Sequence, residues 1–129
     1  MAVYGVGIDL VRIERIEAML GRWGERFERR VFTEHESRTC SGRRAGKAPC
    51  LAMRFAAKEA FSKALGLGMR SPVLWLDIEV RSNKAGKPEI ALSDRALEYC
   101  RGLGITAWHL SLTDEGQYGA AVVVIEAGG

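Results

Sequence analysis

Two carboxylates and one lysine have the residue types and spacing for chemistry on a phosphate group. Asp9 follows an apolar stretch near the N-terminus, and Glu59 and Lys63 are four residues apart in an alanine-rich segment. Mg²⁺ prefers oxygen ligands, usually one or two carboxylates with substrate phosphate and water. A lysine one helical turn from such a carboxylate can hold a phosphate oxygen as a phosphoanhydride is broken. These residues indicate a magnesium-dependent site that transfers a phosphate-linked group.

Each of these residues also has a simpler interpretation. Asp9 is suited to capping a helix that begins near Val11, a frequent role for aspartate. Glu59 and Lys63 can form a surface ion pair along a helix, worth only about 0.3–0.5 kcal/mol. Their surroundings favour a site, because charged groups in an otherwise apolar helical stripe are costly unless they are paired or bind a ligand.

The elements around these residues follow from hydrophobic periodicity. Residues 2–9 alternate as a strand, with Asp9 at its end on the same side as Gly5 and Gly7, where another backbone can approach closely. Residues 51–65 form a central helix with an alanine on every fourth position from Ala52 to Ala64. We expect that alanine stripe to pack against a sheet or a helix, which leaves Glu59 and Lys63 at the edge of a cleft.

The rest of the chain completes a single-domain α+β fold over residues 1–129. Thr33 to Glu36 has the capping-box pattern of a helix start, and residues 41–49 form a polar, basic loop. Ser93 or Asp94 caps a helix that ends near residue 102. We expect strands at 74–81, 89–92, 107–113 and 118–127, with turns at 83–88 and 114–117. This order predicts a mostly antiparallel sheet packed against the long central helix.

Composition excludes several classes of protein. The three cysteines are odd in number and widely spaced, without a CxxC pair, which argues against a disulfide framework or a zinc site and suits a reducing cytoplasm. The N-terminus lacks the basic region of a signal peptide, and no apolar run is long enough to span a membrane. A hydrophobic content of 47% is that of an ordinary globular domain.

Basic residues are concentrated in the first third of the chain. Several arginines share one helical face with Met19 if the first helical region is continuous. A solvated face is the usual explanation for such a charge run, but this face is also suited to an acidic partner helix. The arginines concerned are Arg12, Arg15, Arg22, Arg26 and Arg29.

A late strand carries His109, Ser111 and Thr113 on one face. No GxSxG motif accompanies them, so a serine hydrolase is not supported. The row is suited to hydrogen-bonding an anion, and a solvated strand face is the alternative.

With these residues in view, the chain strongly resembles the holo-acyl-carrier-protein synthase family, the small bacterial 4'-phosphopantetheinyl transferases. The matching segments, which span nearly the whole chain in the expected order, are GIDLV at 7–11 with RIE at 15–17, RFAAKEAFSKALG at 54–66 and HLSLT at 109–113. The turn at 83–88 also resembles the family's Gly-Lys-Pro turn. The central segment is the most specific.

The resemblance implies transfer of 4'-phosphopantetheine from coenzyme A to a serine of apo-acyl carrier protein, with release of adenosine 3',5'-bisphosphate. It implies Mg²⁺ held by Asp9 and Glu59, with Lys63 on the coenzyme A phosphates and Glu59 or water as the base. It also implies a cytoplasmic homotrimer with active sites between subunits. The resemblance assigns Arg15 to docking the acidic carrier, in agreement with the basic helical face that also carries Met19 and Arg22. It assigns Arg54, His109 and Ser111 to holding coenzyme A.

One position departs from the family pattern. Many relatives have a histidine directly after the Ser-x-Thr motif, whereas this chain has Asp114. A role of that histidine cannot be transferred here. The alternative to an enzyme is a basic module that binds nucleic acid or an acidic protein, although no nucleic-acid motif is present and little aromatic interleaving accompanies the arginines.

Overall fold

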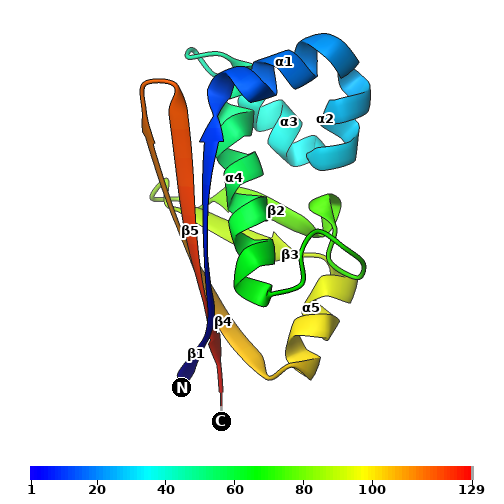
Figure 1. The fold of residues 1–129 in the computed structure, drawn as a ribbon, viewed down its shortest axis with the longest axis vertical. Coiled ribbons are helices and arrows are strands. Elements are labelled where there is room, and N and C mark those ends of the chain that lie inside the picture. The colour runs from blue at the N-terminus through cyan, green and yellow to red at the C-terminus, as the bar shows by residue number, and fades with distance from the viewer. Residues whose placement is uncertain (129) are drawn as a thin grey trace.

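A three-stranded antiparallel sheet forms one side of the molecule. In this computed structural model, which describes residues 1–128, the strand order is β1 (Ala2–Arg12), β5 (Tyr118–Ala127) and β4 (Ile105–Glu115), with β5 in the middle (Figure 1). β1 is therefore an edge strand. The two chain ends lie side by side because β1 and β5 run antiparallel.

The helices and a second, smaller sheet cover one face of this sheet. The central helix α4 (Lys47–Leu65) runs lengthwise along the sheet beside β1, and the helices α1 to α3 gather beside its N-terminal half (Figure 1). Ser93 caps α5, and Thr33 makes the expected capping box at the start of α3. The remaining elements are α1 (Ile13–Trp23), α2 (Glu25–Val31), α3 (Glu34–Ser41), β2 (Ile78–Ser82), β3 (Pro88–Leu92) and α5 (Asp94–Gly102).

β1 packs directly on the backbone of α4 through two glycines. A Cβ atom added at Gly5 would lie 1.9 Å from the carbonyl oxygen of Ala64, and one at Gly7 would lie 1.8 Å from that of Ala60. No side chain fits at either position, and Ala60 and Ala64 are themselves buried. The expected close approach and the alanine packing stripe are both confirmed.

A buried ion pair attaches the smaller sheet and α3 to α4. Lys58 and Glu36 are both fully buried, with Nζ 2.8 Å from Oε1. The ammonium also donates to the carbonyl oxygens of Trp75 at 2.9 Å and Ile78 at 2.6 Å, while Glu36 accepts from the backbone N–H of Val80 at 2.7 Å. Burial lowers the pKa of Lys58, and the charge of Glu36 acts against that shift. The lysine next to Glu59 is therefore a structural residue.

Three expected local structures are wrong. The strand predicted for 74–81 begins only at Ile78, because Trp75–Asp77 forms a 3₁₀ turn. The Asp77 carboxylate holds that turn by accepting from the Leu74 N–H at 2.8 Å. The loop predicted for 41–49 is shorter, since α4 begins at Lys47. The first helical region is broken at Gly24, whose φ of 55° ends α1, so the arginines do not share one continuous helical face.

The expectation that the cysteines form no disulfide is also wrong. Cys40, near the end of α3, is bonded to Cys50 in the first turn of α4. The chain folds back between these helices and so brings the two cysteines together. Their spacing in the sequence matches no recognisable disulfide motif. Cys100 is free and buried.

Fold class is as predicted: a single-domain α+β structure with antiparallel sheets against a long helix. The last residue of the predicted 1–129 domain, Gly129, lies outside the described residues. Within residues 1–128, none of the helices combines the length and the apolar character needed to cross a membrane.

Replacing Gly7 tests the contact between β1 and α4. We expect Gly7→Ala to lower the free energy of unfolding by about 3 kcal/mol, because the new methyl group meets backbone that cannot rotate away. Urea denaturation measures the change. Gly102→Ala, where an added Cβ meets nothing within 4 Å, is the matched control. Equal stability of the two variants would contradict the close packing.

Removing the charge of Glu36 tests the buried pair. Glu36→Gln leaves the Lys58 ammonium buried without a counter-charge, so we expect a loss of about 3–5 kcal/mol in the free energy of unfolding. Glu34→Gln makes the same change on the same helix, where the partner Arg38 and Glu34 are mostly exposed. That control is expected to change stability by less than about 0.5 kcal/mol. If Glu36→Gln lowers the free energy of unfolding no more than Glu34→Gln does, the buried pair contributes little to stability.

Candidate active site

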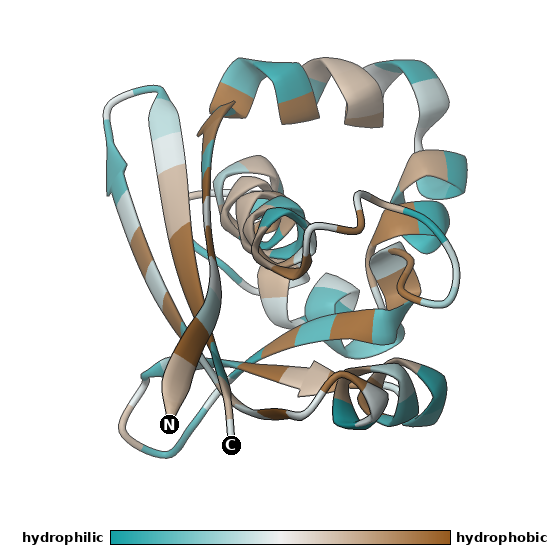
Figure 2. Cartoon of the chain, turned by 60° about the horizontal axis from the view of Figure 1, so that its bottom comes forward, coloured by the Kyte–Doolittle hydropathy of each residue, from teal (hydrophilic) through white to brown (hydrophobic). Residues whose placement is uncertain are grey.

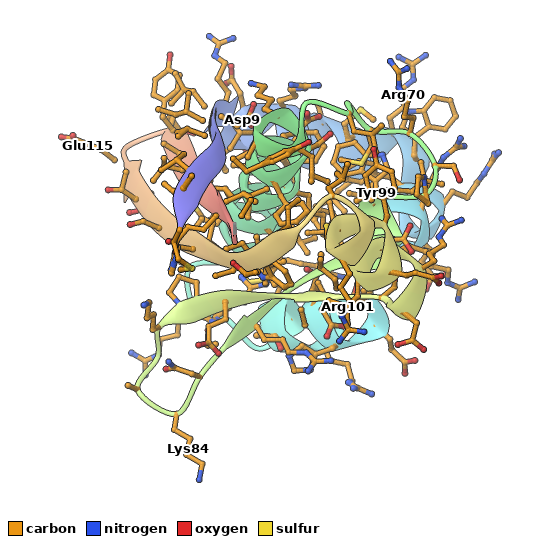
Figure 3. All side chains as sticks on the ribbon, turned by 90° about the horizontal axis from the view of Figure 1, so that it is seen from below. Asp9, Arg70, Lys84, Tyr99, Arg101 and Glu115 are labelled. Atoms are coloured by element: carbon orange, nitrogen blue, oxygen red, sulfur yellow. A yellow bond between two sulfur atoms is a disulfide. The ribbon has the colours of Figure 1, made fainter. Side chains whose placement is uncertain are left out.

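Lys63 and Asp9 meet where β1 lies against the last turns of α4. The Lys63 ammonium donates to Asp9 Oδ1 and to the carbonyl oxygen of Ile8, each at 3.0 Å. Figure 3 shows Asp9 beside α4 on the sheet, at the top of that view. β1 continues three residues beyond Asp9 to Arg12, and Arg12 is the N-cap of α1. The helix-cap interpretation of Asp9 is therefore wrong.

Glu59 lies close enough to Asp9 for the two charges to interact. Burial raises the pKa of Glu59 above its usual value, and the negative charge of Asp9 raises it further. The positive charges of Lys63 and Arg15 oppose the shift. Within residues 1–128, Lys63 makes its ion pair with Asp9 and none with Glu59. The surface-pair interpretation of Glu59 and Lys63 is therefore wrong as well.

The donor set formed by Asp9 and Glu59 fits a hard divalent cation. The negative charge of Asp9 makes it harder to charge Glu59, and a cation between the two carboxylates would remove that cost. The described part of the chain contains no group of three or more His, Cys, Asp or Glu side chains arranged for a metal. A Mg²⁺ ion, which commonly takes one or two carboxylates and completes its shell with phosphate and water, suits this set.

A groove of about 530 Å³ joins Glu59 to the basic helices, and we call it the helical groove. The Arg15 guanidinium lies 5.4 Å from the centre of the Phe55 ring, which stacks on Trp75 at 4.9 Å. The half-buried Met19 lies among them. The full lining is Arg15, Met19, Trp23, Arg26, Phe27, Arg30, Val31, Phe55, Glu59 and Trp75.

Arg22 is outside the lining of the helical groove but next to it. Its guanidinium lies 5.1 Å from the Trp23 ring, and that of Arg26 lies 5.9 Å from the same ring. Sequence reasoning did not select Trp23, Arg30 or Trp75. The position of Trp23 among arginines could have marked it as a groove residue from the sequence. Trp75 could not be found in this way, because it reaches the groove only through the 3₁₀ turn that brings it to Phe55.

Arg54 faces a second groove, which we call the basic groove. This groove, of about 320 Å³, contains Arg43 and Arg54 together with Asp114 and the turn before β3. Arg54 Nη1 donates to the Cys50 carbonyl oxygen at 3.3 Å, while the buried Nε has no partner. Burial lowers the pKa of Arg54; the charge of Glu36 raises it and that of Arg43 lowers it. A buried N–H without a partner, beside a second arginine, is suited to an anion.

His109 and Ser111 lie on the outer face of the sheet, opposite the side that carries Asp9. They are level with Val124 and Val122 of β5. His109 Nε2 is 2.5 Å from Glu126 Oε2. One chain therefore brings together Asp9, Glu59, Lys63, Arg15 and Met19. It keeps Arg54 in a separate groove, and His109 and Ser111 on the other side of the sheet.

Known proteins match this chain along nearly its whole length. Residues 5–123 match the family model of the 4'-phosphopantetheinyl transferase superfamily. A holo-acyl-carrier-protein synthase of Phenylobacterium zucineum is 51% identical, over 97% of this chain and 93% of that protein.

Solved structures of holo-acyl-carrier-protein synthases have the same fold as this chain. The holo-acyl-carrier-protein synthase of Neisseria meningitidis has a TM-score of 0.90 at 35% identity, covering 96% of this chain and 98% of that one. The Helicobacter pylori enzyme in complex with coenzyme A has a TM-score of 0.83 at 32% identity, covering 94% and 99%. With the matched family model and these relatives, the chain belongs to the 4'-phosphopantetheinyl transferase superfamily and, within it, to the holo-acyl-carrier-protein synthase family.

Proposed function

We propose that the chain, acting as one domain over residues 1–129, transfers 4'-phosphopantetheine from coenzyme A to a serine of apo-acyl carrier protein. The products are holo-acyl carrier protein and adenosine 3',5'-bisphosphate, and the setting is fatty acid biosynthesis in the cytoplasm. The observation that carries this proposal is the position of Asp9 close to both Lys63 and Glu59, beside the helical groove, whose arginines suit an acidic protein partner. The relative from Helicobacter pylori binds coenzyme A. A non-enzymatic binding module would not need these carboxylates.

Asp9 and Glu59 are the residues that would hold Mg²⁺. When bound, the ion supplies Lewis-acid stabilisation of the negative charge on the pyrophosphate of coenzyme A. Its use is supported by the two interacting carboxylates described above.

The side chains of the chain supply the rest of the reaction. The hydroxyl oxygen of the carrier serine forms a bond to the β-phosphorus of coenzyme A, and the phosphoanhydride bond to the departing bisphosphate breaks. Lys63 neutralises charge on the phosphate oxygens, at the position where it now meets Asp9. Glu59 or a water molecule beside it is proposed to accept the serine proton.

Arg15, Met19 and Arg22 are proposed to dock the acidic carrier. Arg15 and Met19 line the helical groove, whose other wall includes Glu59, so a carrier bound there presents its serine to the carboxylates. Arg22 extends the positive surface beyond Trp23. Charge complementarity of this kind mainly increases the association rate and selects the partner.

We propose further that the active enzyme is a homotrimer with sites between subunits. The outer sheet face exposes apolar side chains, with Val6 59%, Ile8 67% and Leu10 65% exposed. Figure 2 shows hydrophobic ribbon along the strands of this sheet. An exposed patch of this kind usually marks an interface. Packing of copies through it would bring His109 and Ser111 of one subunit toward the carboxylates of another, where they would hold coenzyme A. Arg54 would hold coenzyme A from the basic groove.

Mass spectrometry of apo-acyl carrier protein incubated with the protein, coenzyme A and Mg²⁺ tests the function. We expect a mass gain of one phosphopantetheine, its loss with a metal chelator and its return with added Mg²⁺. Asp9→Asn and Glu59→Gln are expected to lower kcat/KM at least about 100-fold, since they remove charge from the reacting centre. Glu98→Gln, on the exposed side of α5, is the control. No mass gain across several carriers, or full activity of both variants, would contradict the proposal.

Reversing charge in the docking surface tests the partner assignment. We expect Arg15→Glu combined with Arg22→Glu to raise the KM for the carrier about tenfold or more, because the acidic partner is repelled. The KM for coenzyme A is expected to stay near that of the wild type. Arg101→Glu, on α5 away from Asp9 (Figure 3), is the control. The wild-type KM for the carrier should rise with salt, and a salt-independent KM would contradict docking by charge.

A further inference from the structure

The disulfide between Cys40 and Cys50 lies at the rim of the basic groove. It connects the end of α3 to the start of α4 across a sequence separation of ten residues. The turn enclosed by the bond carries Arg43 and Arg44, and Arg43 lines the basic groove together with Cys50. The bond therefore tethers one of the two arginines of this groove to the helix that carries the other.

Cys50 is also in direct contact with the second arginine. Arg54 Nη1 donates to Cys50 Sγ at 3.2 Å. When the bond is reduced, a guanidinium at this distance stabilises the Cys50 thiolate, the reactive form of cysteine. Cys40 is fully buried behind it. A thiolate that borders an open groove, with a second cysteine within bonding distance, has the arrangement of a redox pair.

Cys100 provides a contrast within the same chain. It is fully buried in α5, and burial raises the pKa of its thiol. Nothing near it favours the thiolate, so we expect it to stay unreactive while the protein is folded.

We propose that Cys40 and Cys50 are a reversible thiol–disulfide modification site that sets the affinity of the basic groove for a phosphate-bearing ligand. In the disulfide form, Arg54 keeps its positive charge at the groove, with its buried Nε–H unpaired, and Arg43 is tethered there. In the dithiol form, the Cys50 thiolate neutralises Arg54 and the tether on Arg43 is released. Oxidation strengthens anion binding and reduction weakens it.

The chemistry needs only a hydroperoxide in one direction and a dithiol in the other. The Cys50 thiolate attacks a peroxide oxygen, the O–O bond breaks, and hydroxide or alkoxide leaves and takes a proton from solvent to become water or an alcohol, which gives a sulfenic acid. The Cys40 sulfur then attacks the Cys50 sulfur, the S–O bond breaks, and water leaves with the Cys40 proton. In reverse, a dithiol that enters the groove attacks the Cys50 sulfur at its lining, and Cys40 leaves as a thiol. The second thiol of the reductant then displaces Cys50 and closes the reductant's own disulfide.

Thiol counting on the full-length protein tests the modification without reference to catalysis. The protein is reduced with dithiothreitol or oxidised with hydrogen peroxide, freed of reagent, then alkylated in denaturant so that buried thiols also react, and weighed intact. We expect two more alkylated cysteines in the reduced form, assigned to Cys40 and Cys50 by peptide mapping. Cys100→Ser should leave this pattern unchanged. A peroxide-treated protein that acquires no Cys40–Cys50 bond would overturn the proposal.

Affinity for coenzyme A, which rests on the proposed function, tests the consequence. We expect the KM for coenzyme A to be about tenfold higher in the reduced form, the effect of losing one charge-assisted hydrogen bond. Cys40→Ser keeps the thiolate and should resemble the reduced form in both buffers. Cys50→Ser removes both the thiolate and the tether on Arg43. If its KM for coenzyme A is near that of the oxidised wild type, neutralisation of Arg54 by the thiolate is the larger effect and release of Arg43 the smaller. A KM that is equal in the oxidised and reduced wild type would overturn the switch even if the disulfide forms.

Discussion

The contact of β1 with α4 is the constraint on which the site depends. Gly5 and Gly7 place the strand against the carbonyl oxygens of Ala64 and Ala60, with no space for a side chain between the two backbones. Asp9 follows two residues later on the same face of the strand, because side chains alternate along it. The alignment of β1 with the turns of α4 therefore places the Asp9 carboxylate next to Lys63 and near Glu59. A strand held farther from the helix would leave each of these charges to solvent.

The opposite side of α4 is anchored by charge. Lys58 follows Phe55 by less than one turn and precedes Glu59, yet its ammonium is fully buried against Glu36 and two carbonyl oxygens. A buried pair is expensive to form and expensive to break, so it specifies one arrangement of α3, the 3₁₀ turn and α4. That arrangement brings Trp75 onto Phe55 and so builds the wall of the helical groove on which Arg15 rests. The helix α4 thus carries both Glu59 and Phe55, the ring on which Arg15 of the docking surface rests.

Much of the fold and the centre of the site could be predicted from local patterns. The capping box at Thr33, the packing alanines and the glycine side of β1 are encoded within a few residues of one another, and these predictions are confirmed. Asp9 and Glu59 also stood out, because charged groups interrupt apolar periodicity at both positions.

Features that depend on distant parts of the chain could not be predicted in this way. The pairing of Lys58 with Glu36, the disulfide and the meeting of Arg43 with Arg54 all arise from how α3 folds back on α4. The alternation of Leu74 and Leu76 suggested a strand, but hydrogen bonds to Asp77 produce a turn and leave both leucines exposed. His109 and Ser111 lie on the outer face of the sheet, away from Asp9, and the alternation along the strand does not by itself say which face is which.

The central claim is that Asp9 and Glu59 together hold the cation used in phosphate transfer. Anomalous diffraction from crystals grown with coenzyme A and Mn²⁺, which replaces Mg²⁺ at oxygen sites, tests this directly. We expect one strong peak bridging the Asp9 and Glu59 carboxylates and the pyrophosphate, with Lys63 on a phosphate oxygen. A pyrophosphate bound without a metal between these carboxylates, or a metal held by other residues, would contradict the account.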